Sequence, residues 1–136
     1  MSDAAVIDAI RARFKTEVAD DLDLLTIYDN GTEPVQPPAL WCRLAVQVDD
    51  TRQVSMGVRR YRMTGAATAM VFGKSQKGEA EVNAVADAIV AAFRGVSMSD
   101  PMVTFSPPPG FAGFIDRDEG WARRTVRIPF RADVVE

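Results

Sequence analysis

The sequence has 136 residues, a formal net charge of −3, one cysteine and no histidine. A chain of this length corresponds to one domain with a self-sufficient core, and a single cysteine excludes an internal disulfide. The lack of histidine removes the commonest general base and metal ligand, and the acidic balance argues against a surface devoted to phosphate. Ordinary hydrolase chemistry and a uniformly basic nucleic-acid-binding surface are therefore disfavoured.

The N-terminal segment predicts a short helix that begins at Ser2 or Asp3, either of which is a suitable N-cap. Its apolar face consists of Val6, Ile7, Ile10 and Phe14. Charged residues interrupt the apolar pattern through residue 16, so neither a signal peptide nor a membrane span is expected. The protein is expected to be made for the cytosol, or to leave it without secretion. Residues 24–28 predict a short strand or an irregular packed segment.

Three prolines in residues 31–39 predict an extended connector or arm. From residue 40 to residue 48, apolar residues alternate with others, which is typical of a strand with one buried face. Cys42 lies on the apolar side, which favours an inert core thiol over a nucleophile. Residues 49–51 predict a turn, and residues 53–57 a second strand that returns beside the first.

The middle of the chain predicts a long strand at residues 59–73 and an amphipathic helix at residues 79–94. Gly65 within the strand predicts a bulge or a close backbone approach. The helix carries one apolar stripe at three- and four-residue spacings: Val82, Val85, Ala86, Ile89, Val90 and Phe93. We expect this strand and helix to anchor the core, with the first helix on the same face of the sheet.

After a loop at residues 96–101, residues 102–105 predict a short strand and residues 106–113 a proline-rich loop. The closing strand alternates apolar residues with a second set that contains Arg123, Arg127 and Arg131. Pro129 has no amide donor, so this strand is expected at an edge, or with that position turned away from a partner. Together these elements predict a single α+β domain over residues 1–136, with one mostly antiparallel β-sheet and two main helices packed on one face.

Motifs for chemistry are incomplete. Gly73, Lys74 and Ser75 resemble the end of a phosphate loop, but Thr68 occupies the place of the required upstream glycine. The acidic run at residues 116–120 lacks the spacing of a calcium loop and favours a charged hairpin turn. No serine, threonine or cysteine has an identifiable base partner. We therefore predict no catalytic, cofactor-binding or metal-binding residue, and a protein that is not an enzyme.

The arginines offer a different kind of site. Three of them lie along one face of the closing strand, and a second group, Arg59, Arg60 and Arg62, begins the long middle strand. Such a stripe is either a solvated face, an interface with another subunit, or a nucleic-acid-binding surface. Because only Trp121 and Tyr61 lie near these stripes to stack on bases, a protein partner is favoured over a single strand of nucleic acid.

Five motifs occur in an order that is informative as a set: Trp41-Cys42-Arg43-Leu44, Gln53-Val54-Ser55-Met56-Gly57, Tyr61-Arg62-Met63-Thr64-Gly65, the helix at residues 84–93, and Thr125-Val126-Arg127-Ile128-Pro129-Phe130. In this order the sequence resembles the tail terminator family of long-tailed bacteriophages and prophages. The resemblance covers roughly residues 41–132. It rests on the order and spacing of the motifs more than on any one of them.

The resemblance implies a structural protein of the virion tail, assembled in the host bacterial cytoplasm as a homohexameric ring. Such a ring caps the completed tail tube, stops polymerisation of the major tail tube protein and provides a surface for the head–tail connector protein. It implies no cofactor, no membrane and no sequence-specific nucleic acid.

The candidate interface residues come from this chain alone and are Arg52, Gln53, Arg60, Arg62, Arg123, Arg127 and Arg131. The loops at residues 31–39 and 106–113 are further candidates, because proline reduces the entropy lost on docking. The alternative is a small nucleic-acid-binding module that uses the arginine-rich strand, and steep salt dependence of binding separates the two.

Overall fold

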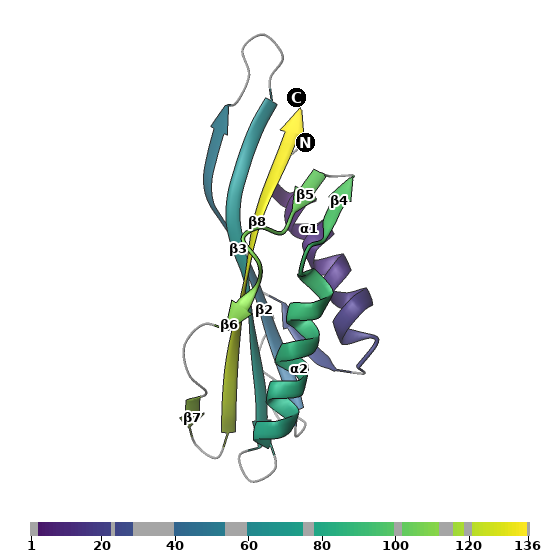
Figure 1. Cartoon of the computed structure of the whole chain (residues 1–136), viewed down its shortest axis with the longest axis vertical. Helices are drawn as coiled ribbons and strands as arrows, with labels where there is room; N and C mark the ends of the chain where they lie inside the picture. Colours follow the sequence, from purple (N-terminus) through teal and green to yellow (C-terminus); the bar gives the residue numbers. More distant parts are fainter. Residues whose placement is uncertain are drawn as a thin grey trace.

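Three long strands, β2 (Leu40–Gln53), β3 (Arg60–Lys74) and β8 (Trp121–Val135), run the length of the molecule and form the centre of the sheet (Figure 1). This computed structural model describes residues 3–22, 24–28, 40–53, 60–74, 78–99, 102–111, 116–118 and 121–135. The helical elements are α1 (Asp3–Phe14), η1 (Lys15–Ala19) and α2 (Gly78–Phe93). The other strands are β1 (Leu25–Tyr28), β4 (Ser97–Ser99), β5 (Met102–Thr104), β6 (Gly110–Phe111) and β7 (Asp116–Asp118).

Within the described residues, eight strands form one sheet in the order β1-β2-β3-β8-β5-β4, and β6 and β7 also pair with β8. The predicted α+β class is confirmed, but the sheet is mixed rather than mostly antiparallel, because β1 runs parallel to β2. A hairpin needs only a few residues, whereas parallel neighbours need a connection that returns to the starting end. The connection between β1 and β2 lies outside the described residues, and no local pattern in the sequence indicates the direction of β1.

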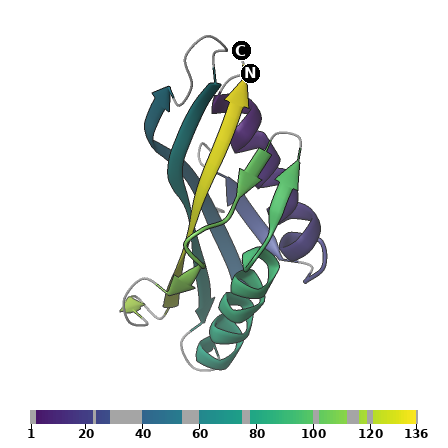
Figure 2. The ribbon, with the colours of Figure 1, turned by 45° about the horizontal axis from the view of Figure 1, so that its top comes forward.

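Both helices pack on the same side of the sheet, as predicted (Figures 1 and 2). The predicted stripe of α2 is buried throughout, and the helix lies within one residue of its predicted bounds. In α1, Val6, Ile10 and Phe14 are fully buried. The two helices and the sheet thus enclose one hydrophobic cluster between them.

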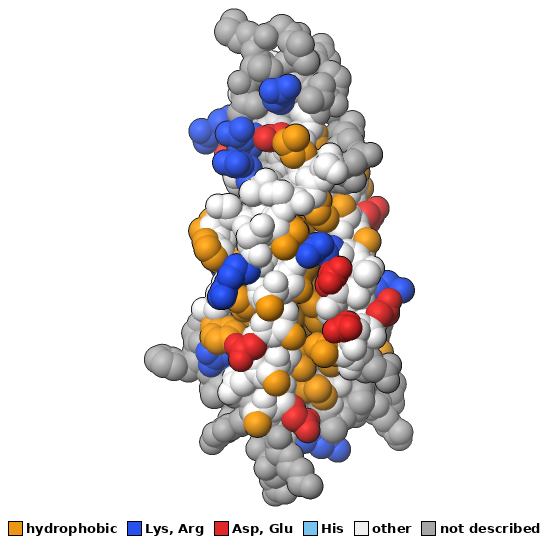
Figure 3. All heavy atoms as spheres, turned by 45° about the vertical axis from the view of Figure 1, so that its right-hand side comes forward, with side chains coloured by type: hydrophobic (Ala, Val, Ile, Leu, Met, Phe, Trp, Pro, Cys, Tyr) orange, Lys and Arg blue, Asp and Glu red, His pale blue; other side chains and the backbone are white. Residues whose placement is uncertain are grey.

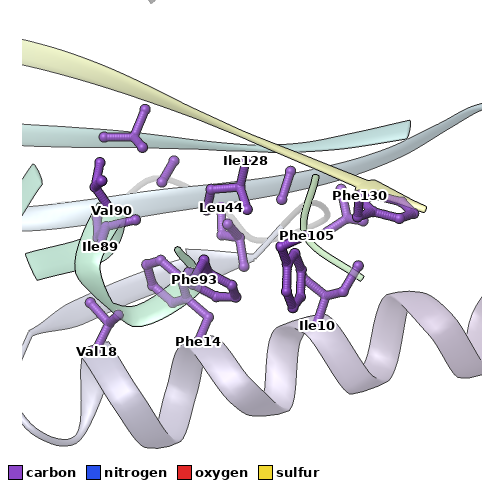
Figure 4. Packing of buried hydrophobic residues seen from close by; sticks show 14 of the residues in the cluster. Ile10, Phe14, Val18, Leu44, Ile89, Val90, Phe93, Phe105, Ile128 and Phe130 are labelled. Carbon is purple, nitrogen blue, oxygen red and sulfur yellow. The ribbon is translucent and has the colours of Figure 1, made fainter. Parts of the chain in front are cut away.

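Aromatic rings join the helices to the short strands inside this cluster (Figure 4). The ring centroid of Phe93 lies 6.3 Å from that of Phe14 in a stacked arrangement and 4.9 Å from that of Phe105 in an edge-to-face one. Such ring pairs add about 0.5–1.5 kcal/mol beyond the burial of their area. Phe93 is therefore the point where α1, α2 and the segment after β5 meet.

The predicted turn at residues 49–51 is wrong, because β2 continues to Gln53. Val48 pairs with Gly65 and Asp50 with Thr64, so one extra residue of β2 is accommodated by a β-bulge. At Gly65 the carbonyl oxygen of Gln47 occupies the space that a Cβ atom would need. The predicted close backbone approach at Gly65 is confirmed. Of the second strand predicted at residues 53–57, Gln53 belongs to β2 instead, and the other residues lie outside the described residues.

Pro129 does not mark an edge strand, since β8 lies between β3 and β5. On the side away from β3, β8 pairs with β6 at Val126 and Arg127 and with β5 from Arg131 onward. Pro129 falls between these two pairings, so its missing amide donor is tolerated inside the sheet.

Two further segments were predicted without strands or as a turn. The predicted loop at residues 96–101 contains a strand, β4. The charged hairpin predicted at residues 116–120 is confirmed by the pairing of β7 with the start of β8.

Candidate functional site

The three long strands present one face to the helices and one face away from them, and we call the second the outer sheet face. Side chains at paired positions of neighbouring strands point to the same face. Read across β2, β3 and β8, the paired rows of the outer sheet face are Arg52–Arg62–Asp133, Asp50–Thr64–Arg131, Gln47–Ala66–Pro129, Ala45–Thr68–Arg127, Arg43–Met70–Thr125 and Trp41–Phe72–Arg123. Most of the predicted interface residues lie in these rows.

Arg123, Arg127 and Arg131 of β8 are all exposed on the outer sheet face. Consecutive members of the series are four residues apart, which is about 13 Å along a strand. Among the described residues, neither Arg127 nor Arg131 forms an ion pair. These two guanidinium groups therefore remain available to a partner.

The other predicted arginines cluster at the far end of the same face. Arg62 donates a hydrogen bond from Nε to Oδ1 of Asp133 at 2.9 Å, which raises the pKa of Arg62. Arg52 contacts Asp50 of its own strand, with Nη2 and Oδ2 3.3 Å apart. The Arg52–Asp50 pair is too exposed to add much to stability, whereas the Arg62–Asp133 pair is partly buried. They hold a mixed-charge patch in place at this end of the sheet.

Two of the predicted residues differ from this pattern. Arg60 is exposed at the start of β3 and pairs in register with Val135. Gln53 pairs with Tyr61, and the alternation places it on the opposite side from Arg52. The structure thus brings the predicted arginines to one face and separates Gln53 from them.

Sequence reasoning missed an apolar patch on the outer sheet face. Trp41 stacks on Phe72 with ring centroids 4.3 Å apart and ring planes 14° apart. Leu25 of β1 is in register with Trp41, and its exposed fraction is 43%. The available signal was the position of Trp41 opposite the buried series that contains Cys42. Tryptophan, phenylalanine and arginine together are typical of protein interfaces.

The helix side carries both signs of charge, with two acids on α2 and the exposed basic residues Lys15 and Arg94. In α2, Glu81 and Asp87 are exposed, and neither forms an ion pair with a described residue. Figure 3 looks toward this side and shows acidic side chains at several places along it, with a group of basic side chains near the top. Around the helix axis, four alanines lie between the two acids: Ala80, Ala84 and Ala91 are exposed and Ala88 is half-buried. The molecule therefore has two chemically different faces.

The core thiol and the loop candidates complete the site residues. Cys42 is buried, as predicted, and burial raises its pKa from 9.0 to about 12.

The connector at residues 31–39 lies outside the described residues, as do residues 112–113 of the second loop. No group of three or more potential metal ligands occurs among the described side chains. None of the described helices is long and apolar enough to cross a membrane.

Comparisons with known proteins bear on the fold. No family model matches the sequence, and no curated protein matches it. Among solved structures, 22 chains match. One of these, a protein that carries no functional name, superposes with a TM-score of 0.63 at 24% sequence identity, over 95% of this chain and 94% of the other. The shared fold extends over nearly the whole chain, and at this level of identity it carries no function.

Proposed function

We propose that this protein is a structural tail protein of a long-tailed phage or prophage, which assembles as a ring on the finished tail tube. The ring stops polymerisation of the major tail tube protein and offers its other side to the head–tail connector protein. The proposal places the protein in the virion tail after assembly in the bacterial cytoplasm. It needs neither a cofactor nor a reactive group.

The observation that carries the proposal is the outer sheet face. It combines exposed arginines with the exposed Leu25, which lies beside the stacked pair of the buried Trp41 and the half-buried Phe72. Interface cores are enriched in aromatic residues, methionine and arginine, and Met70 lies in the same area. The order of sequence motifs and the α+β fold support the same reading. The proposed class of function is therefore assembly through protein surfaces.

The decisive test is polymerisation of the tube protein with and without this chain. Electron microscopy of negatively stained tubes measures their length distribution. We expect short, capped tubes with a ring at one end when the chain is present. Tubes of the same uncontrolled length in both samples would reject the capping function.

A specific observation also favours a second candidate, a nucleic-acid-binding module. Arg123, Arg127 and Arg131 repeat at about 13 Å along one exposed strand, which suits contacts with a phosphate backbone. However, Trp41 is only 6% exposed and is stacked on Phe72, so it offers no free ring to a base. Titration of labelled DNA and RNA at two salt concentrations separates the candidates, because phosphate contacts weaken steeply as salt rises.

A further inference from the structure

We propose that the outer sheet face of one copy packs against the exposed side of α2 in the next copy, in a head-to-tail arrangement. The occupant of this sheet face is thus a second copy of the same chain. The inference rests on the proposed function, since it describes how the subunits of the ring contact one another. It is carried by the shape and the charge of the two surfaces.

The two surfaces match in shape. On the outer sheet face, Ala66 and Thr68 of β3 are small, so the sheet is low beside Arg127, whereas Met70 and Phe72 further along the same strand are larger. On α2, the alanines lie within about 40° of Ala84 around the helix axis, at 100° per residue. The small side chains on both surfaces allow the helix to approach β3 closely at Ala66 and Thr68.

The charges of the two surfaces are also complementary when the helix lies along β3. Glu81 and Asp87 lie on either side of the alanine stripe, about 120° apart around α2. Strands β2 and β8 lie on either side of β3, about 10 Å apart. A helix over β3 therefore directs one acidic side chain toward β8, where Arg127 and Arg131 have no ion pair among the described residues. The long arginine side chains bridge the remaining distance.

The same charges oppose the alternative symmetric contact. Two outer sheet faces in contact at Arg123 and Arg127 would bring like charges together, although Asp50 and Asp133 lie at the far end of the same face. Two α2 surfaces in contact would bring Glu81 and Asp87 of the two copies together. Each copy instead uses two different surfaces, one to bind the previous copy and one to bind the next. Contacts of this kind generate closed rings when the rotation closes, and open filaments when it does not.

Cross-linking between two single-cysteine variants tests the arrangement directly. Arg127→Cys and Asp87→Cys are prepared separately, each is mixed with the other, and the mixture is oxidised. The native Cys42 is buried and does not compete. We expect a disulfide-linked dimer that contains one copy of each variant, identified by mass spectrometry. The matched control is Lys15→Cys, which is exposed on the helix side but outside α2.

Two outcomes overturn the inference. One is a product formed only between two copies of R127C. The other is no mixed product of R127C with either D87C or E81C, the two acids that border the alanine stripe, both for the chain alone and in the presence of the tube protein.

Charge reversal provides a second, independent measurement. Arg127→Glu and Asp87→Arg each place like charges in the contact, and we expect each to weaken self-association by about tenfold or more. The double variant restores the opposite charges, and we expect it to recover most of the loss. Sedimentation equilibrium measures association, and unchanged thermal unfolding of these exposed variants shows that they fold. No recovery in the double variant contradicts the contact.

The interface and the capping function fail separately. If the mixed cross-link forms but tube length is unaffected, the head-to-tail contact is established and the capping function is rejected. If tubes are capped but the cross-link joins two outer sheet faces, the capping function stands and this contact is rejected.

Discussion

Arg13 of α1 donates two hydrogen bonds to the main-chain oxygen of Ala92, from Nε at 3.2 Å and from Nη2 at 2.8 Å. Ala92 is the second-last residue of α2. Its carbonyl oxygen is therefore one of those that the end of an α-helix leaves without an intrahelical donor. The guanidinium carbon of Arg13 also lies 5.8 Å from the ring centroid of Phe93. One side chain thereby caps α2 and fixes it against α1.

We expect Arg13→Met to lower the free energy of unfolding by about 1–3 kcal/mol, because it removes a charged donor from a partly buried carbonyl. Arg13→Lys keeps the charge but loses the two-pronged geometry, so its loss should be smaller. Urea denaturation measures both. Lys15→Met is the matched control, since the ion pair of Lys15 with Asp20 is largely exposed. Equal losses for Arg13→Met and Lys15→Met would contradict the capping role.

The bulge opposite Gly65 leaves no room for a methyl group. A Cβ atom there would meet the carbonyl oxygen of Gln47 and lie 3.0 Å from both the Phe130 ring and the Val48 Cα atom. We expect Gly65→Ala to destabilise the fold by about 1–3 kcal/mol. Gly110→Ala makes the same change in β6 with open space around it, and should shift stability by less than about 0.5 kcal/mol. Thermal unfolding compares the two variants, and similar melting temperatures would argue against the close approach.

Ile89 is fully buried where α2 faces the sheet. Ile89→Ala removes three carbon atoms from a packed site and should reduce the free energy of unfolding by about 2–5 kcal/mol. Asn83→Ala, on the exposed side of the same helix, is the control and should stay within about 0.5 kcal/mol of the parent. Chemical denaturation followed by circular dichroism measures both. A near-neutral Ile89→Ala would mean that α2 does not pack on the sheet as described.

Stability should depend on alkaline pH through Cys42. Burial raises the pKa of this thiol from 9.0 to about 12, so between these values the folded chain holds a proton that the unfolded chain has lost. The stabilisation is therefore complete below pH 9 and is lost as the pH rises toward 12, by at most about 1.4 kcal/mol per pH unit. Burial also raises the pKa of Tyr28, which acts in the same direction at higher pH.

The measurement is the free energy of unfolding against pH for the parent and for Cys42→Ala. The variant should be less stable at neutral pH, because it leaves a small cavity, but its decline above pH 9 should be shallower. Parallel curves would show that Cys42 does not titrate differently in the two states.

Local patterns in the sequence were sufficient for the elements that bury one regular face. The stripe of α2 and the alternation of β8 repeat over many residues, so their type and bounds were predicted closely. The direction of β1 and the central position of β8 were not predicted, because both depend on which strands pair. For Pro129, the predicted edge placement is wrong for this reason, whereas the other predicted alternative, a position turned away from a partner, agrees with the gap that β5 and β6 leave where it lies.

The candidate site shows the same division. The arginine stripe was visible in one strand, and its placement on an exposed face is confirmed for Arg123, Arg127 and Arg131. The stacking of Trp41 on Phe72 requires the register between β2 and β3, which no local pattern contains. Its function as an interface stays a prediction.

The extra residue in β2 has a consequence for comparing this chain with distant relatives. Before the bulge, even-numbered residues of β2 such as Leu44 face the core, and after it the even-numbered Arg52 faces outward. An alignment that extends the near half of the strand without a one-residue offset would therefore equate interior positions with surface positions throughout the far half. Substitutions tolerated at one end of β2 thus give a misleading guide to the other end, unless the two halves are matched separately.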